Sequence, residues 1–272
     1  MEAMIYIFQK KHICFNDLSF SNKKEIPSCT LKNFPTEIEH CIEWSKSNFI
    51  ELFNQIIKDI QFIHENKNQF YEILNDKISP LEFYIKLQKM TYLINIIDNP
   101  SNINIIKYGI FLFKYYFDFT IEQTLKEFPL EGKNGVKYWD NYRKAPKPIK
   151  IDCNDITTKN FFKSFYYIIN NLINYNENNY IIDDNYIINK IKKEESGINI
   201  NLKDLNNKQL LKLFENNIIK KVENNENNIQ KKLNDIKTMI FEKDNDENHH
   251  INFIMLMSNL RARNYQIKEC DF

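Results

Sequence analysis

Glycine and proline are scarce in this sequence of 272 residues, which contains four glycines and seven prolines. Sandwiches and barrels need many turns built from these two residues, so their scarcity argues against a turn-dense β fold. Hydrophobic residues make up 43% of the chain, which is enough for a substantial core. We therefore expect a globular fold that is mainly α.

Charge of one sign and long apolar runs are also lacking. The chain has 37 basic and 36 acidic side chains, a net charge of +1. Because sequence-independent binding of nucleic acid or of anionic membranes needs a strong positive field, we expect neither partner. No apolar run approaches the roughly 18 residues of a membrane span, and residues 1–20 lack the features of a signal peptide. These absences predict a cytoplasmic or nuclear protein.

The cysteines do not form a pattern typical of disulfides or zinc. Their number is odd, they are scattered, and no C-x-x-C pair occurs. A reducing compartment fits this usage. The five are Cys14, Cys29, Cys41, Cys153 and Cys270.

Hydrophobic periodicity predicts helices along most of the chain. Thr36 is expected to be the N-cap of a long amphipathic helix, with Glu39 as its capping-box partner. Residues 176–234 are rich in Asn and Lys, and polar tracts such as 223–228 are typical of mobile insertions. The predicted helices are 36–60, 70–76, 80–97, 102–120, 122–128, 157–175, 184–193, 207–217 and 251–265, with a strand at 5–8.

Cys29 has the most interesting local setting of the five. It lies between a polar linker and the start of a predicted helix, two residues after Pro27, where its thiol can be exposed. Positive charge at a helix start favours a thiolate. A lone cysteine is nevertheless more often a buried core residue than a nucleophile, and we expect Cys41 to be such a core residue. Pairing with His40 or His64 would resemble a cysteine protease, but no flanking signature supports it.

Two further clusters give only superficial signals. His249 and His250 follow an acidic stretch at 244–247, yet adjacent helical residues do not share a face. A solvated helix start with acidic charges accounts for them better than a metal site. Gly132 and Gly135 lie near lysines, but neither phosphate-loop motif is present. We therefore expect no nucleotide site in this chain.

Four segments carry a recognisable combination of motifs. They are I-P-S-C-T-L-K-N-F-P with I-E-H and Trp at 26–44, Y-W with R-K-A-P-K-P and I-D at 138–152, F-E-K-D-N-D with H-I and F-I at 241–254, and S-N-L-R-A with N-Y at 258–265. In order and spacing they resemble the ubiquitin-activating enzymes. SUMO-activating subunits generally have W-D-K-D-D where this chain has F-E-K-D, which favours the ubiquitin branch.

The resemblance implies an architecture. The motifs delimit the family's second catalytic cysteine half-domain, a multi-helical domain with short extended or strand segments at its ends. Residues 1–25 would be a strand and crossover linker from the adenylation domain. Residues 26–240 would be the half-domain, with 176–234 as a variable Asn-rich insertion, and 241–272 would lead back to the adenylation domain.

The resemblance also implies residue roles. Cys29 would be the nucleophile that holds ubiquitin as a thioester before a ubiquitin-conjugating enzyme takes it. Thr30, Asn154 and Asp155 would be helpers that orient or stabilise the reacting groups. For Asp155 the alternative is a simple cap at the start of the following helix.

Features of the complete enzyme are absent from these 272 residues. The family's nucleotide-binding loop and magnesium-binding Asp are not found, so ATP and magnesium are expected in the complete enzyme and no cofactor in this chain. We expect an excised piece whose partners are ubiquitin, ubiquitin-conjugating enzymes and the adenylation domains of the same polypeptide. Two rivals remain. One is an activator of SUMO or another ubiquitin-like protein, and the other is a catalytically silent helical module with Cys29 sealed in its core.

Overall fold

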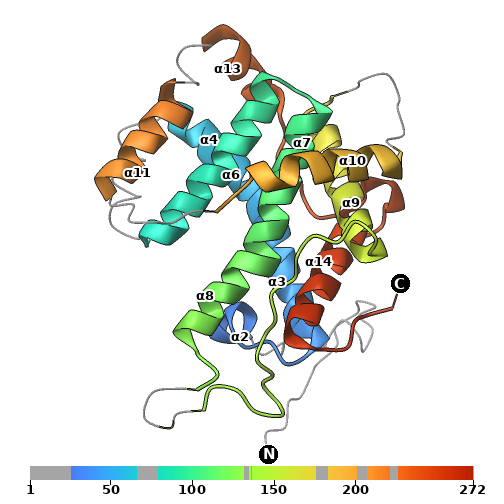
Figure 1. Ribbon diagram of the computed structural model, residues 1–272. Coiled ribbons are helices and arrows are strands. Elements are labelled where there is room, and N and C mark those ends of the chain that lie inside the picture. The colour runs from blue at the N-terminus through green and yellow to red at the C-terminus, as the bar shows by residue number, and fades with distance from the viewer. Residues whose placement is uncertain are drawn as a thin grey trace, which may run out of the picture.

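The computed structural model describes residues 26–65, 79–131, 135, 137–175, 183–200, 207–220 and 226–271. These residues form helices and contain no β-strand, so the prediction of a mainly α fold is confirmed (Figure 1). The strand predicted at 5–8 and the helix predicted at 70–76 lie outside the described residues. The elements are α2 (Ser28–Lys32), α3 (Ile38–Ile50), η2 (Glu51–Gln55), α4 (Ile56–Glu65), α6 (Pro80–Asp98), α7 (Asn102–Phe113), η3 (Lys114–Phe119), α8 (Thr120–Glu127), α9 (Ile156–Leu172), α10 (Asp184–Glu194), η5 (Glu195–Gly197), α11 (Asn207–Phe214), η6 (Glu215–Ile219), α13 (Glu226–Asp235), η7 (Asp246–Asn248) and α14 (His250–Tyr265).

Two long rods form the frame of the domain. In each, two α-helices are joined without a break through a π-helical turn, giving α3–η2–α4 and α7–η3–α8. The second rod corrects the sequence prediction, which separated a helix ending at Thr120 from one beginning at Glu122. The backbone stays helical through Thr120, and Pro129 follows soon after the rod ends.

The helix starts include one complete capping box, and one predicted box that does not form. Ser79 caps α6 together with Glu82 in a complete capping box, directly before Pro80. The predicted box of Thr36 and Glu39 does not form, because α3 begins only at Ile38. The Thr36 backbone N–H instead donates to Nδ1 of His40, at 3.1 Å.

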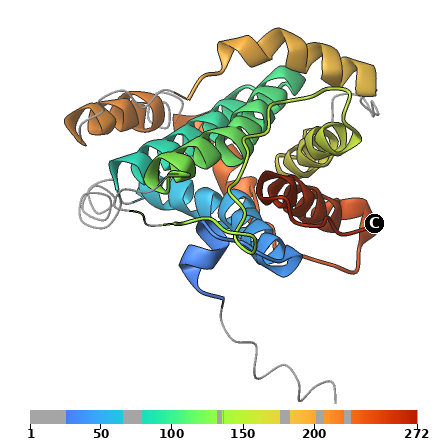
Figure 2. The same ribbon diagram turned by 60° about the horizontal axis from the view of Figure 1, so that its bottom comes forward.

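The core forms where α14 packs against both α3 and α9, as Figures 1 and 2 show. Its centre is a set of stacked and edge-on rings, including Phe53, Phe161 and Phe253. Gly109 lets α7 approach α9 closely, since a Cβ there would lie 3.1 Å from the Phe162 ring. Burial of these aromatic side chains, together with the aliphatic residues around them, stabilises the domain through the hydrophobic effect.

The Asn-rich region contributes to this core as well. Ile191 of α10, Phe214 of α11 and Leu233 of α13 are buried. The structure corrects the prediction for 226–228, which form the first turn of α13, whereas 223–225 lie outside the described residues. Figure 1 shows α11 and α13 at the end of the molecule opposite to α2. Asn and Lys residues form these helices because the apolar residues between them keep helical spacing.

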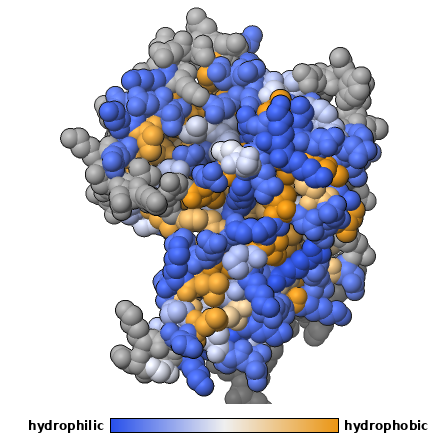
Figure 3. Space-filling model, in the orientation of Figure 1, coloured by the Kyte–Doolittle hydropathy of each residue, from blue (hydrophilic) through white to orange (hydrophobic). Residues whose placement is uncertain are grey.

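The surface seen in Figure 3 is mostly hydrophilic, with hydrophobic side chains exposed in separate small groups. Within the described part of the chain, no helix combines the length and apolar character that crossing a bilayer demands.

Candidate active site

Cys29 lies in the first turn of α2, a helix of five residues, and is exposed. The carbonyl of Pro27 accepts from the backbone N–H of Thr30, at 2.9 Å, and the Cys29 carbonyl accepts from that of Asn33, at 2.8 Å. The expectation of an exposed thiol is confirmed. Its backbone differs from the expectation, because Cys29 belongs to a helix of its own rather than to a linker ahead of α3. A helix this short is not stable alone and needs tertiary support.

Arg261 of α14 supplies that support. Its Nη2 donates to the carbonyl oxygens of Leu31, at 2.8 Å, and Lys32, at 2.6 Å. These are the last carbonyls of α2, which have no partner within the helix. The guanidinium lies 4.1 Å from the centre of the Trp44 ring and 5.1 Å from that of Tyr265. Charge-assisted hydrogen bonds and cation–π contacts thus fasten the cysteine helix to the core.

The burial of Arg261 makes this anchor sensitive to change. The residue is only 2% exposed, and burial lowers the pKa of its guanidinium. A buried cation is costly unless its partners are well placed. Arg261 therefore has to keep its contacts with α2 and with the Trp44 ring.

The four motif segments, distant in sequence, meet around α2 and α14. Trp139 packs against Phe34, with ring centres 5.3 Å apart, and its Nε1 donates to the Phe128 carbonyl. Asn264 donates to the Lys147 carbonyl at 2.7 Å, and the Lys147 backbone N–H donates back to the carbonyl of Asn264. The loop between Pro129 and Pro148 is thereby tied to the end of α14. These contacts join the motif segments at 26–44, 138–152 and 258–265 in space.

A cavity of about 750 Å³ lies beside α2, between α3, α6 and the α7–η3–α8 rod. Its wall holds Lys89, which is 2% exposed and donates to Oε1 of Glu51 at 2.7 Å. Burial lowers the pKa of Lys89, and the Glu51 carboxylate opposes that shift. Lys32 and Glu82 also line the cavity, with 3.7 Å between Nζ and Oε1. Charged side chains thus line the cavity next to α2.

Two of the predicted helpers have simple backbone settings. Thr30 follows Cys29 in α2 and is half-buried. Asn154 is exposed, and its backbone N–H donates to Oδ1 of Asp152 at 2.8 Å, which forms a turn before α9.

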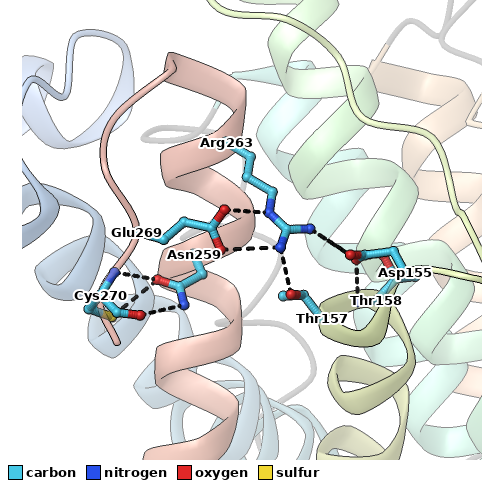
Figure 4. A network of polar contacts seen from close by, with 7 residues as sticks. All are labelled: Asp155, Thr157, Thr158, Asn259, Arg263, Glu269 and Cys270. Atoms are coloured by element: carbon cyan, nitrogen blue, oxygen red, sulfur yellow. Dashed lines mark hydrogen bonds and ion pairs between the residues drawn. The ribbon is translucent and has the colours of Figure 1, made fainter. Parts of the chain in front are cut away.

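Asp155 is engaged by α9 and α14 rather than by α2 (Figure 4). Its Oδ2 accepts from the backbone N–H and the hydroxyl of Thr158, both at 2.8 Å, which makes it the N-cap of α9. Both of its oxygens lie 3.0 Å from Nη1 of Arg263. Burial works to raise the pKa of Asp155, but the bonds from Thr158 and Arg263 lower it overall. The capping interpretation of Asp155 is confirmed.

The same network fixes the segment that follows α14. Arg263 donates from Nε to Oε1 of Glu269 at 2.7 Å, and this bond raises the pKa of Arg263. The Asn259 side chain donates from Nδ2 to the Cys270 carbonyl and accepts the Cys270 backbone N–H at Oδ1, each at 3.0 Å. Figure 4 shows both pairs on one side of α14. Arg261 therefore holds α2, whereas Arg263 holds the start of α9 and the segment that follows α14.

Sequence reasoning assigned no role to Arg261, Arg263 or Lys89. Arg261 is the arginine of the S-N-L-R-A motif, and that motif was the available signal for it. Arg263 lies between S-N-L-R-A and N-Y, at a position that no motif specifies. Lys89 lies among apolar residues of α6, and no periodic signal separates it from a surface lysine.

The remaining candidates have structural roles. Cys41 is buried, and burial raises the pKa of its thiol to about 11. His250 is also buried, which lowers its pKa, and its Nδ1 accepts from the Glu242 backbone N–H at 3.3 Å. The expectation of a solvated helix start is therefore wrong for His250. Across the described residues, no three His, Cys, Asp or Glu side chains are grouped to hold a metal ion.

The structure describes one of the two histidines that were considered, and not supported, as protease-like partners of Cys29. The Nδ1 of His40 accepts from the Thr36 backbone N–H rather than contacting a thiol. The side chain of His64 lies outside the described residues.

Comparison with known proteins gives a consistent picture. The family model "Ubiquitin-activating enzyme, SCCH domain" matches residues 35–272, a range that begins after Cys29. The chain is 30% identical to ubiquitin-like modifier-activating enzyme 1 of Dictyostelium discoideum over 268 residues, and 29% identical to ubiquitin-activating enzyme E1 1 of Candida albicans over 262. It is 29% identical to mouse ubiquitin-like modifier-activating enzyme 6 over 266 residues. Each match covers 92% of this chain and 25% of the relative, so the chain spans about a quarter of their length.

Proposed function

Since the chain belongs to the ubiquitin-activating enzymes, as their SCCH domain, we propose that it carries the modifier as a thioester on Cys29 within a longer polypeptide. The observation that carries this proposal is the exposed Cys29 on a short helix that the fully buried Arg261 anchors. A thiol that must meet two large partners in turn has to be accessible and held in place.

The proposed reaction has two steps. The Cys29 sulfur attacks the carbonyl carbon of a modifier activated as its acyl-adenylate, a C–S bond forms, and the bond to the AMP phosphate oxygen breaks. The thiol of a ubiquitin-conjugating enzyme then attacks the thioester, takes the acyl group and releases Cys29 as the thiolate. ATP and magnesium act in the first activation, on adenylation domains in other parts of the polypeptide. We place this reaction in the cytoplasm and nucleus.

Within the chain, each site residue has a defined part. Cys29 forms the covalent bond, and Thr30 next to it is proposed to orient the reacting carbonyl. Asn154 and Asp155 are proposed helpers that would have to reach the site through movement of the α9 start. In the present arrangement Asp155 is held by Thr158 and Arg263.

We propose ubiquitin as the modifier. The F-E-K-D segment favours the ubiquitin branch over the SUMO branch, although two of the relatives above are named for ubiquitin-like modifiers in general. The purified modifier that supports thioester formation decides between them. A silent helical module would have no need of an exposed thiol at the anchored helix.

The decisive experiment is Cys29→Ala in the full-length polypeptide. The variant should lose the reducible thioester with ubiquitin, because the acceptor sulfur is gone. Ubiquitin-dependent exchange between ATP and pyrophosphate should persist, because it takes place on the adenylation domains. A thioester that survives the substitution would refute the assignment. Cys41→Ala is the matched control, since Cys41 is buried and should not affect the thioester.

A further inference from the structure

We propose that Lys32 is a self-acylation site, whose amine takes the acyl group from a thioester on Cys29, and that Glu82 restrains this transfer. The biological source of the thioester rests on the proposed function above. The transfer itself rests on the geometry of α2 and on the contact between α2 and α6.

Cys29 and Lys32 are neighbours on the surface of α2. They stand three residues apart in the helix, a spacing that places Cβ atoms about 5–6 Å from each other. Both side chains are exposed, that of Lys32 by 66%. The four-carbon lysine stem can span this distance. Arg261 binds the Leu31 and Lys32 carbonyls, so the helical spacing is maintained.

The transfer balances without any further reagent. The neutral Lys32 nitrogen attacks the thioester carbonyl carbon, a C–N bond forms, and the C–S bond breaks. The sulfur leaves as the Cys29 thiolate, and the proton from the nitrogen goes to solvent or to that thiolate. The amide product is resistant to thiols, so the acyl group can no longer pass to a conjugating enzyme. Neighbouring groups held in place react as if at very high concentration.

Glu82 directs the lysine away from the thiol. Its Oε1 lies 3.7 Å from Lys32 Nζ. Its Oε2 accepts from the Ser79 hydroxyl at 3.1 Å, so the carboxylate is fixed at the start of α6. Lys32 and Glu82 both line the cavity beside α2, whereas among the described residues Cys29 is not part of that lining. The ion pair therefore holds the ammonium on the cavity side of the helix.

The restraint should be modest in size. Exposed ion pairs are weak, so losing this one is expected to speed the transfer by about two- to five-fold. The Glu82→Gln variant isolates the effect, because glutamine removes the charge yet still completes a capping box with Ser79.

The test uses the 272-residue chain and a small probe, the thioester of N-acetylglycine with 2-mercaptoethanesulfonate. The probe loads Cys29 by thiol exchange, without ATP or adenylation domains. Tryptic mass spectrometry after hydroxylamine then distinguishes the labile adduct on Cys29 from the stable amide on Lys32. The amide should appear after the thioester, and faster from pH 7 to pH 9, because only an unprotonated amine is a nucleophile.

Three controls identify the route. Cys29→Ala should lose the Lys32 amide, and Lys32→Arg should leave only the labile adduct. Lys46 is an internal control, since it pairs with Glu43 at 2.9 Å but has no cysteine within one helical turn. Its acylation should stay at background.

Three outcomes would overturn the proposal. They are a Lys32 amide that forms equally in Cys29→Ala, a Lys32 amide no more abundant than that on Lys46, and a stable Cys29 thioester that never transfers. An unchanged rate in Glu82→Gln would overturn the role of Glu82. None of these outcomes changes the result of the full-length Cys29→Ala experiment. Failure of this proposal can therefore be distinguished from failure of the proposed function.

Discussion

Replacing Arg261 by alanine should release α2 from the core. The variant loses two hydrogen bonds from a charged donor, each worth about 1.5–3 kcal/mol, and a cation–π contact with Trp44. The cost of burying the guanidinium is recovered at the same time and offsets part of this loss. We expect a net loss of about 3 kcal/mol in the stability of the docked α2 helix, equivalent to roughly 100-fold in its opening equilibrium.

Hydrogen exchange on the Thr30 and Asn33 amides measures this opening, because both donate within or next to α2. Their protection should fall about 100-fold in Arg261→Ala, while amides in the centre of α9 change little. Arg263→Ala is the control, since Arg263 contacts Asp155 and Glu269 instead of α2. Unchanged α2 protection in Arg261→Ala, or an equal loss in Arg263→Ala, would refute the anchoring role.

Two further predictions concern the frame around the site. Asp155→Asn keeps an N-cap for α9 but loses the ion pair with Arg263, so urea unfolding at pH 7 should show a loss of about 1 kcal/mol. The folded state lowers the pKa of Asp155, so the stabilisation from its carboxylate is complete above the pKa of the unfolded chain and is lost as the pH falls through the pKa of the folded state. A wild type that remained more stable than Asp155→Asn in strong acid would contradict this pH dependence. Gly109→Ala places a Cβ 3.1 Å from the Phe162 ring and should destabilise the domain by about 1–3 kcal/mol, seen as a lower melting temperature, and an unchanged value would show that α9 adjusts freely.

Local signals predicted most of the helices. The apolar spacing within 80–97 depends on residues close in sequence, and the structure has α6 there, at Pro80–Asp98. The failures have equally local causes. At α3 the His40 ring takes the Thr36 backbone N–H, so the predicted cap is displaced. Beyond Thr120 nothing in the chain breaks the helix, and the rod continues to Glu127.

The site, unlike the helices, depends mainly on contacts between residues distant in sequence. The motifs pointed to the family and to Cys29 as the proposed nucleophile. The contacts that hold Cys29 in place join α2 to α14, and Leu31 and Arg261 are 230 residues apart in the sequence. Spacing along the chain contains no information on such a pair. The sequence also predicted a helper role for Asp155, but in the structure Thr158 and Arg263 bind its carboxylate.

By itself, the sequence determined that this chain is helical, that its net charge is close to zero, and that the segment around Cys29 resembles the ubiquitin-activating enzymes. These properties depend on composition, periodicity and the order of residues. Only the tertiary structure decided that Cys29 has a helix of its own, that Arg261 fastens this helix, and that Glu82 draws Lys32 toward α6. The physical reason is that the strength of these contacts depends on burial and on distances between side chains, which arise only when the helices pack together.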